Sequence, residues 1–225
     1  MLLQIALDLR KLDFGMAYSE FTLPIMARQF SLTIDETTNL FPNIQDVLLR
    51  PGFKAQLDEL VPLALAISTE KARSELIIAP VLLEFWRTTK RQIGFFSGVL
   101  FDVDKSQGLD GYCDYILTRT PRQLFVEAPV LMLVEAKNED MKRGYGQCLA
   151  EMLAAQRFNT MDSHRFGQDE SVYGIVTTGE RWKFLELAGN AARIDSEDYY
   201  LEHISKIMGI LLHLTRTQAA SDATD

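Results

Sequence analysis

The sequence has few of the residues that build disulfide frameworks and clustered metal sites. Its 225 residues include two cysteines, Cys113 and Cys148, and three histidines. Two cysteines without a second pair do not form a tetrahedral zinc site, so we expect buried free thiols. The histidines, His164, His203 and His213, lack the three- or four-residue helical spacing that brings two imidazoles to one metal. We therefore expect a core or surface position for each.

Long apolar runs and a leader peptide are also missing. Runs such as LVPLALAI at 60–67 are far shorter than the ~20 residues needed to cross a bilayer. The opening MLLQIALDLRK has no basic leader before its apolar stretch and no small-residue cleavage site, so no secretory signal is expected. We predict a cytoplasmic protein without a membrane partner.

The chain has no excess of positive charge. It contains 23 Lys and Arg against 31 Asp and Glu, a formal net charge of -8. This argues against a protein that coats nucleic acid non-specifically, because such binding depends on many cationic contacts to phosphate. A nuclease is not excluded, since carboxylates that hold a divalent cation count as negative in the sequence. The apolar content of 47% is that of a soluble globular protein with its own core.

The chain divides into three parts. Prolines break the mixed pattern of residues 1–66, which predicts a helical extension that packs on the core. Its last helix is expected at 53–67, with a kink or a break at Pro62. Residues 67–217 form the main domain, and the polar tail at 218–225 is predicted to be disordered.

The main domain alternates between helical and β-type patterns. Ser68-Thr69 offers an N-cap to a helix that Pro80 should bend or divide. A helix is also expected at 144–158, with Gly144 and Gly146 at its entrance, and another near 197–216. The strands expected from β-type composition are 93–104, 112–119, 129–137, 171–179 and 181–189.

Opposite charges meet at the end of the most apolar strand, PVLMLVEAK. Side chains alternate between the two faces of a strand, so Glu135 and Lys137 share one face while Ala136 points to the other. Asp114 lies among apolar residues of the preceding strand, where an unpaired carboxylate is costly. We expect it to face Glu135. A second acid-x-Lys tripeptide, at 140–142, sits in a polar turn and lacks this context.

These residues give the chain its resemblance to a known family. A helix bearing acids, a strand with Asp, a strand ending in Glu-x-Lys and a helix with an early Gln resemble the αβββαβ core of the PD-(D/E)XK, or restriction-endonuclease-like, nucleases. The resemblance covers residues 68–190, and TEKARSELIIAP and VYGIVTTGERWKFLEL are similar to segments of the nuclease domain of type I restriction motor subunits. It implies an α/β fold with a central mixed sheet flanked by helices. Cys113 stands where the family's name has proline.

The resemblance implies a Mg2+- or Mn2+-dependent nuclease, with DNA as the expected substrate. Asp114 and Glu135 would be metal ligands, the Ala136 carbonyl would complete the set, and Lys137 would orient or activate the attacking water. Gln147 is expected to support the site, although a helix-end amide bonded to backbone explains it equally well. Four residues further on, Glu151 is predicted to be a solvated or locally paired helix charge.

Further site residues are predicted from the helices. Glu70, Glu75 and Glu84 compete for the role of helix acid; Glu70 best matches the restriction-subunit pattern, although a helix N-terminus favours acids in any case. The expected phosphate contacts are Arg87, Lys90, Arg91, Lys142 and Arg143, with solvated charged faces as the alternative reading. Tyr145 could stack on a base, but packing at a helix entrance is the commoner role.

Two other functions are compatible with these patterns. The first is a catalytically inactive nuclease-fold module that binds a partner or assembles, in keeping with the acidic charge. The second is a carboxylate hydrolase on a non-nucleic substrate, which accounts less well for Lys137 beside two acids. A homodimer and a separate protein that supplies target recognition both fit the sequence.

Overall fold

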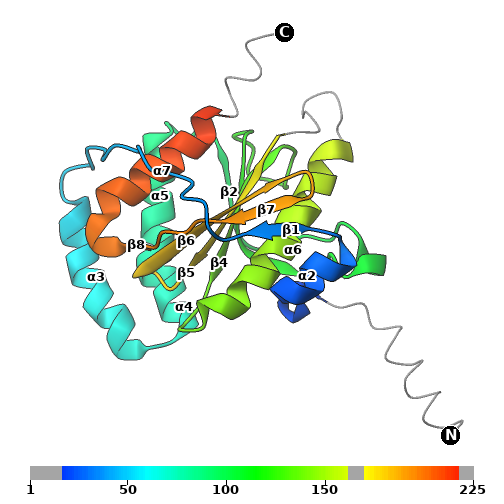
Figure 1. Cartoon of the computed structure of the whole chain (residues 1–225). Coiled ribbons are helices and arrows are strands. Elements are labelled where there is room, and N and C mark those ends of the chain that lie inside the picture. The colour runs from blue at the N-terminus through cyan, green and yellow to red at the C-terminus, as the bar shows by residue number, and fades with distance from the viewer. Residues whose placement is uncertain (1–16, 162–169, 218–225) are drawn as a thin grey trace, which may run out of the picture.

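A mixed sheet of eight strands runs through the middle of the described chain, which comprises residues 17–161 and 170–217 of a computed structural model (Figure 1). The order across the sheet is β1-β7-β6-β5-β4-β3-β2, and β8 pairs with β6. The pairs β4–β5 and β1–β7 are parallel and the others antiparallel. The strands are β1 (Thr33–Asp35), β2 (Gly94–Leu100), β3 (Tyr112–Thr118), β4 (Val130–Ala136), β5 (Val172–Thr177), β6 (Arg181–Ala188), β7 (Ala191–Ile194) and β8 (Tyr199–Tyr200).

Helices cover both faces of this sheet (Figure 1). Residues of α6 and α2 share one buried cluster with one face, whereas residues of α3, α5 and α7 share a second cluster with the other. The helices are α2 (Leu23–Gln29), α3 (Phe53–Ile67), α4 (Glu70–Arg73), α5 (Ala79–Thr88), α6 (Met141–Met161) and α7 (Ile204–Thr217), with a π-helix, η2, at Ser74–Ile78 and 3-10 turns η1 (Tyr18–Glu20), η3 (Lys105–Gln107) and η4 (Leu201–His203). No helix in the described ranges is long and apolar enough to span a membrane.

The expected α/β class and the mixed sheet flanked by helices are confirmed. All seven residues of β4 are buried, as an apolar run without alternation predicts for a central strand. The five expected strands correspond to β2, β3, β4, β5 and β6. The last helix begins at Ile204 rather than near 197, because β8 and η4 occupy the residues before it.

The N-terminal segment contains more than the predicted helices. Its strand β1 pairs in parallel with β7 and so joins the sheet. Three residues are too short for period-two alternation to be recognised, which is why the strand was not predicted. Helix α3 runs through Pro62 without interruption. The predicted tail at 218–225 lies outside the described residues.

The helix before β2 keeps its predicted start. Thr69 is the N-cap of α4, and its side chain accepts a hydrogen bond from the Ala72 amide. The helical run continues through the π-helix to Thr88, with Pro80 in the first turn of α5. The missing amide of proline is tolerated in a first turn, so the division of this helix falls just before Pro80.

The prediction that Gly144 and Gly146 form a helix entrance is wrong. Helix α6 already begins at Met141, and the Asp140 carboxylate accepts a hydrogen bond from the Arg143 amide in its first turn. The two glycines lie inside the helix at places of close approach. A Cβ on Gly144 would lie 2.7 Å from Cγ1 of Val176, and one on Gly146 would collide with the backbone of the N-terminal segment.

Candidate active site

Two acidic residues lie opposite one another on β3 and β4. The register pairs Tyr115 with Val134, so the next residues along this antiparallel ladder are Asp114 and Glu135. Opposite residues of antiparallel strands point to the same face of the sheet. Oδ2 of Asp114 accepts a hydrogen bond from the Ala136 amide at 2.8 Å, which holds this carboxylate beside the end of β4. The structure thus brings together the two acids selected from the sequence.

Lys137 directly follows β4 and joins this pair. Its Nζ atom forms an ion pair with Oε1 of Glu135 and donates a second hydrogen bond to Oε1 of Gln147 at 3.3 Å. The side chain of Glu135 is 2% exposed and that of Lys137 is 16% exposed. The ammonium therefore links a buried carboxylate to the surface of the protein.

Burial dominates the electrostatics of the ion pair. The pKa of Glu135 is raised to about 8, first by burial and then by the negative charge of Asp114, against the opposing effect of Lys137. Burial lowers the pKa of the Lys137 ammonium, but the Glu135 carboxylate more than compensates, and the net pKa is raised. Lys137 stays charged at neutral pH, whereas Glu135 holds its proton far more tightly than an exposed glutamate.

Glu151 is part of the same cluster. Of the two roles predicted for it, a solvated or a locally paired helix charge, the solvated one is wrong, and its local partner on the helix is Gln147. The residue is 0% exposed. Its Oε1 atom accepts a hydrogen bond from Nε2 of Gln147 at 3.2 Å, and its carboxyl group lies beside that of Glu135. Burial, and then the negative charge of Glu135, raise the pKa of Glu151 well above its ordinary value.

The contact between Glu135 and Glu151 requires a proton. The Oε2 atoms of both residues are buried and receive no hydrogen bond from a donor in the described chain. Ionised carboxylates only accept hydrogen bonds, so a bond between two carboxyl groups needs a proton on one of them. The raised pKa values of Glu135 and Glu151 favour a proton in this contact when no cation is bound.

Helix α6 lies unusually close to β4 and β5 at this point. A Cβ on Gly144 would meet Cγ of Lys137 at 3.1 Å as well as the side chain of Val176. Glycine thus allows the helix to pack on the aliphatic stem of Lys137. Gln147 and Glu151 lie one and two helical turns further along, where they face the carboxylate of Glu135.

The three candidate acids of the first helix separate clearly. Glu70 lines the same surface hollow as Lys137, and its negative charge raises the pKa of that lysine. Glu75 forms an exposed ion pair with Lys71. Glu84 is buried elsewhere and is paired with arginines. Of the three, only Glu70 lies at the site.

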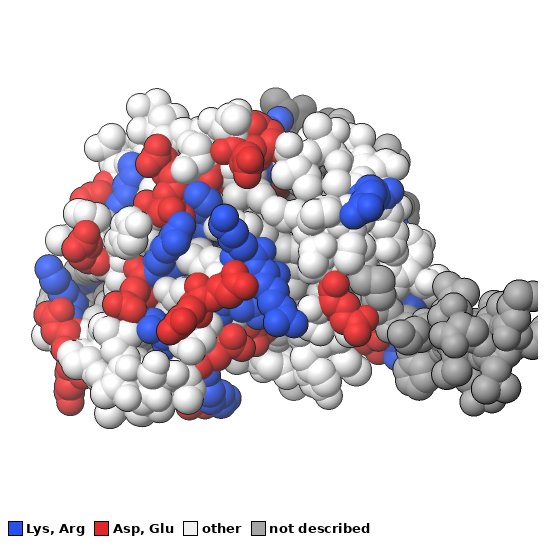
Figure 2. Space-filling view, turned by 60° about the horizontal axis from the view of Figure 1, so that its bottom comes forward, with Lys and Arg blue, Asp and Glu red and all other residues white. Residues whose placement is uncertain are grey.

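A hollow of about 380 Å³ opens above the cluster; we call it the site hollow. Figure 2 shows Lys and Arg side chains mixed with Asp and Glu on the face of the molecule that lies at the bottom of Figure 1, where α4 and the start of α6 are found. Because the hollow is lined by both basic and acidic side chains, it suits a negatively charged ligand that binds together with a metal cation. It is lined by Ser19, Glu70, Lys137, Asn138, Glu139, Asp140, Arg143 and Gln147.

The predicted phosphate contacts fall into two groups. Arg143 lines the site hollow, and Lys142 is the exposed residue before it. Arg87, Lys90 and Arg91 lie instead at the end of α5, before the start of β2.

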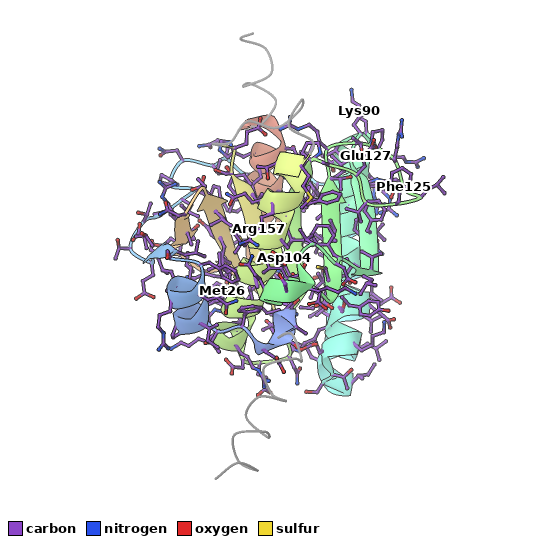
Figure 3. The ribbon with its side chains drawn as sticks, turned by 90° about the vertical axis from the view of Figure 1, so that its right-hand side faces the viewer. Met26, Lys90, Asp104, Phe125, Glu127 and Arg157 are labelled. Carbon is purple, nitrogen blue, oxygen red and sulfur yellow. The ribbon has the colours of Figure 1, made fainter. Side chains whose placement is uncertain are left out.

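The second group lies at the wrong end of the sheet. Gly94, at the start of β2, pairs with Thr118, whereas Leu100 pairs with Tyr112 near Asp114. A strand of this length spans roughly 20 Å. Figure 3 shows Lys90 and Asp104, which flank β2, at different heights. The arginines of this group already have partners, because Arg87 pairs with Glu84 and Arg91 stacks on Trp86.

The oxygen atoms of this cluster fit a small, hard cation. Oε2 of Glu135 is buried without a donor, and Asp114 lies beside it. The amide and carbonyl of one strand residue point to the same side, so the Ala136 carbonyl is directed toward Asp114. Across residues 17–161 and 170–217, no group of three or more His, Cys, Asp and Glu is arranged to hold a metal. An ion here would rely on two carboxylates, a carbonyl and water, a set that suits Mg2+.

The remaining candidate residues take structural positions. Cys113 and Cys148 are buried free thiols, as expected. Tyr145 is 9% exposed and packs in the core, which agrees with the packing interpretation. His203 lies beside Glu202 and His213 against Phe41. His164 lies outside the described residues.

Three residues near the site escaped the sequence interpretation. Glu151 could have been recognised, because it lies between apolar residues on the buried face of an expected helix. Ser19 could not, since it reaches the hollow from the far end of the sequence. Asn138 accepts a hydrogen bond from Nε of Arg73 at 3.1 Å, and Nη1 of this arginine pairs with Glu180 at 2.9 Å. These contacts fix α4 beside the ends of β4 and β5.

Comparisons with known proteins found no match for this chain among family models, curated proteins or solved structures. The resemblance noted from the sequence therefore rests on the residues that carry it.

Proposed function

We propose that this chain is a metal-dependent nuclease that hydrolyses phosphodiester bonds, with DNA as its substrate. The observation that carries the proposal is the convergence of Asp114, Glu135, Lys137 and Gln147 at the end of β4, beneath an open hollow. A buried ion pair is seldom placed for stability alone, since hydrophobic replacements are often equally stable. Perturbed pKa values in a cleft are typical of functional sites.

The order of elements supports the restriction-endonuclease-like interpretation. A helical run over α4 to α5 is followed by the antiparallel strands β2, β3 and β4, the crossing helix α6, and β5 parallel to β4. This is the αβββαβ order of the family that the sequence resembles. The acidic residues lie on the second and third of these strands, where the family places its own.

Asp114 and Glu135 would hold Mg2+ or Mn2+, and the Ala136 carbonyl would add a neutral oxygen. A cation bound there would polarise the scissile phosphate and compensate the negative charge that develops on its oxygens. Binding of a cation would also relieve the repulsion between the buried carboxylates. In the metal-free protein this repulsion favours the protonated, neutral form of a carboxyl group.

Lys137 would act on water or phosphate rather than on the metal. An ammonium group has no lone pair for a cation, but it has three protons to donate. Two are directed to Glu135 and Gln147, which leaves one for an attacking water or a phosphate oxygen. Its partial exposure places this proton at the floor of the site hollow.

The rim of the site hollow offers contacts for the rest of the substrate. Arg143 and Lys142 would bind phosphates on either side of the scissile bond. Glu70 stands on the opposite wall from α6 and could orient a water molecule. The acidic residues of the rim, Glu139 and Asp140, make binding depend on cations in solution, because they repel a polyanion.

The proposal is tested by incubating single- and double-stranded DNA and RNA with the protein at low salt, with Mg2+, Mn2+ or EDTA. We expect the wild type to cleave DNA only with a divalent ion, and Lys137→Ala to lose cleavage by at least about a hundredfold while retaining Mn2+ binding by calorimetry. Lys183→Ala is the matched control. Lys183 is also a buried, paired lysine, but it contacts Asp198 and Glu197 away from the hollow.

Equal cleavage by wild type and Lys137→Ala would remove Lys137 from the mechanism. If the wild type binds Mn2+ but cleaves no nucleic acid, the catalytically inactive binding module becomes the better interpretation. The acidic composition and the mixed charges around the hollow favour that second candidate.

A further inference from the structure

Four side chains form a closed ring between β4 and α6. Lys137 pairs with Glu135 and donates to Oε1 of Gln147 at 3.3 Å. Nε2 of Gln147 donates to Oε1 of Glu151 at 3.2 Å, and the carboxyl group of Glu151 lies beside that of Glu135. Each member of the ring thus has contacts to two others.

Glu151 is the member of the ring that solvent and substrate do not reach. It is 0% exposed and does not line the site hollow, whereas Lys137 and Gln147 do. A residue so placed acts on the reaction through its neighbours. The close approach of α6 that Gly144 permits brings Glu151 within reach of both Glu135 and Gln147.

The carboxyl group of Glu151 selects one orientation of the Gln147 amide. An amide side chain can rotate so that its oxygen and nitrogen exchange places. With Nε2 on the Glu151 side, Oε1 faces the Lys137 ammonium and accepts its proton. In the reverse orientation an NH2 group would face the ammonium, and two donors would be in contact. An acceptor at residue 151 is what favours the first arrangement.

We propose that Glu151 is a positioning residue, which orients the Gln147 amide and holds the Glu135 carboxylate so that the Lys137 ammonium is fixed at the floor of the site hollow. The catalytic consequence rests on the function proposed above, but the positional one does not. Groups that hold metal ligands and catalytic side chains in place are as important to a site as the ligands themselves, with typical losses of about 10- to 100-fold on removal.

The test compares Glu151→Gln with Glu151→Leu. An amide at 151 can still accept a proton from Gln147 and donate one to Glu135, whereas leucine fills similar space and can do neither. Metal-free crystal structures should show the contact between Lys137 and Gln147 kept in Glu151→Gln and lost in Glu151→Leu. Gln147→Leu removes the hydrogen bonds of Gln147 to both Lys137 and Glu151 and should also displace the Lys137 ammonium. This variant keeps the proposal testable if Glu151→Leu does not fold.

Kinetics give the second measurement. With DNA and Mg2+, Glu151→Leu should lower kcat about 10- to 100-fold with a much smaller change in KM, and Glu151→Gln should restore most of the loss. Glu84→Leu is the matched control, because it also removes a buried glutamate, 2% exposed, that has no contact with the site. It should lower the melting temperature and leave kcat largely unchanged.

The outcomes separate the two proposals. A wild type that cleaves nothing, combined with a lysine displaced only in the leucine variants, would refute the nuclease and support the positioning role. A Lys137 ammonium in the same place in Glu151→Leu and in wild type would overturn the positioning role. So would a Glu151→Gln variant as impaired as Glu151→Leu, because the charge of Glu151 rather than its hydrogen bonds would then matter.

Discussion

Buried glutamates occur in two regions of this molecule with opposite surroundings. Glu84 on α5 is 2% exposed. Its Oε2 atom forms ion pairs with Nε of Arg50 at 3.1 Å and with Nη1 of Arg87 at 3.5 Å. Glu135 and Glu151 are equally buried, but the single lysine of the cluster pairs with Glu135 alone, and Glu151 accepts a hydrogen bond from the neutral Gln147.

The difference lies in the balance of charge. Two arginines compensate one carboxylate at Glu84, which makes that contact a structural link between α5 and the segment before α3. At the end of β4, three acids, Asp114, Glu135 and Glu151, share a cluster with one ammonium, which pairs with Glu135. A protein loses stability by burying more acids than cations. The excess of acid is therefore the part of the structure that points to a ligand.

The largest effect expected from this comparison is a dependence of stability on pH. The pKa of Glu135 is about 8 in the folded protein and 4.5 in its ordinary state. Between these values the folded protein binds more protons than the unfolded chain, so stability falls as pH rises. From Glu135 alone, we expect the metal-free protein to lose up to about 1.4 kcal/mol of unfolding free energy per pH unit between pH 5 and pH 8.

Urea denaturation in EDTA at four pH values would measure this slope. The slope should become shallower in Glu135→Gln, which has no proton to lose, and should persist in Glu84→Gln. An unchanged slope in Glu135→Gln would show that the crowding of acids at the end of β4 does not destabilise the protein.

The second prediction is that the same substitution, Glu to Gln, changes the unfolding free energy in opposite directions at the two sites. At pH 8 without metal, Glu135→Gln should raise the unfolding free energy by roughly 1–3 kcal/mol, because it removes one of several crowded acids. Glu84→Gln should lower it by a similar amount, because two arginines lose their carboxylate. Thermal denaturation measures both, and calorimetry should show weaker Mn2+ binding only for Glu135→Gln. A loss of stability in both variants would make Glu135 a structural ion-pair member as well.

The smallest effect is expected from the surface cations. Arg143→Ala should raise KM for DNA by about tenfold, roughly 1.4 kcal/mol, and reduce the salt dependence of binding. Arg87→Ala, at the opposite end of β2, should change KM by less than about twofold, because it lies too far from the hollow to contact the same phosphate. Equal losses in both variants would indicate a substrate path that runs along the sheet.

The sequence predicted the centre of the candidate site because strand geometry is simple. The apolar run VLMLV identified β4, and the alternation of side chains placed Glu135 and Lys137 on one face. Asp114 followed from the cost of an unpaired acid among apolar neighbours. These arguments use only residues close together in the sequence and need no knowledge of how helices pack.

The features that the sequence did not predict depend on how α6 packs on the sheet and on where distant strands pair. The solvated position expected for Glu151 reflects the preference of glutamate for exposed helix positions, although its apolar neighbours along α6 indicate the buried face. The sequence does not show how closely Gly144 lets α6 approach the sheet. Arg87, Lys90 and Arg91 are expected phosphate contacts at the end of the first core helix, but β2 then runs the length of the sheet before β3 returns to Asp114. The short strands β1 and β8 depend on partners distant in sequence.

One residue that lines the site hollow comes from far outside the segment that resembles a nuclease. Ser19 lines the hollow, Phe21 packs its backbone against Gly146 of α6, and Tyr18 donates a hydrogen bond to the Phe101 carbonyl at 2.7 Å. The site is therefore not modular. A chain shortened to begin at residue 67 would retain every residue of the acid cluster, yet its hollow would open into solvent on one side and α6 would lose its outer support.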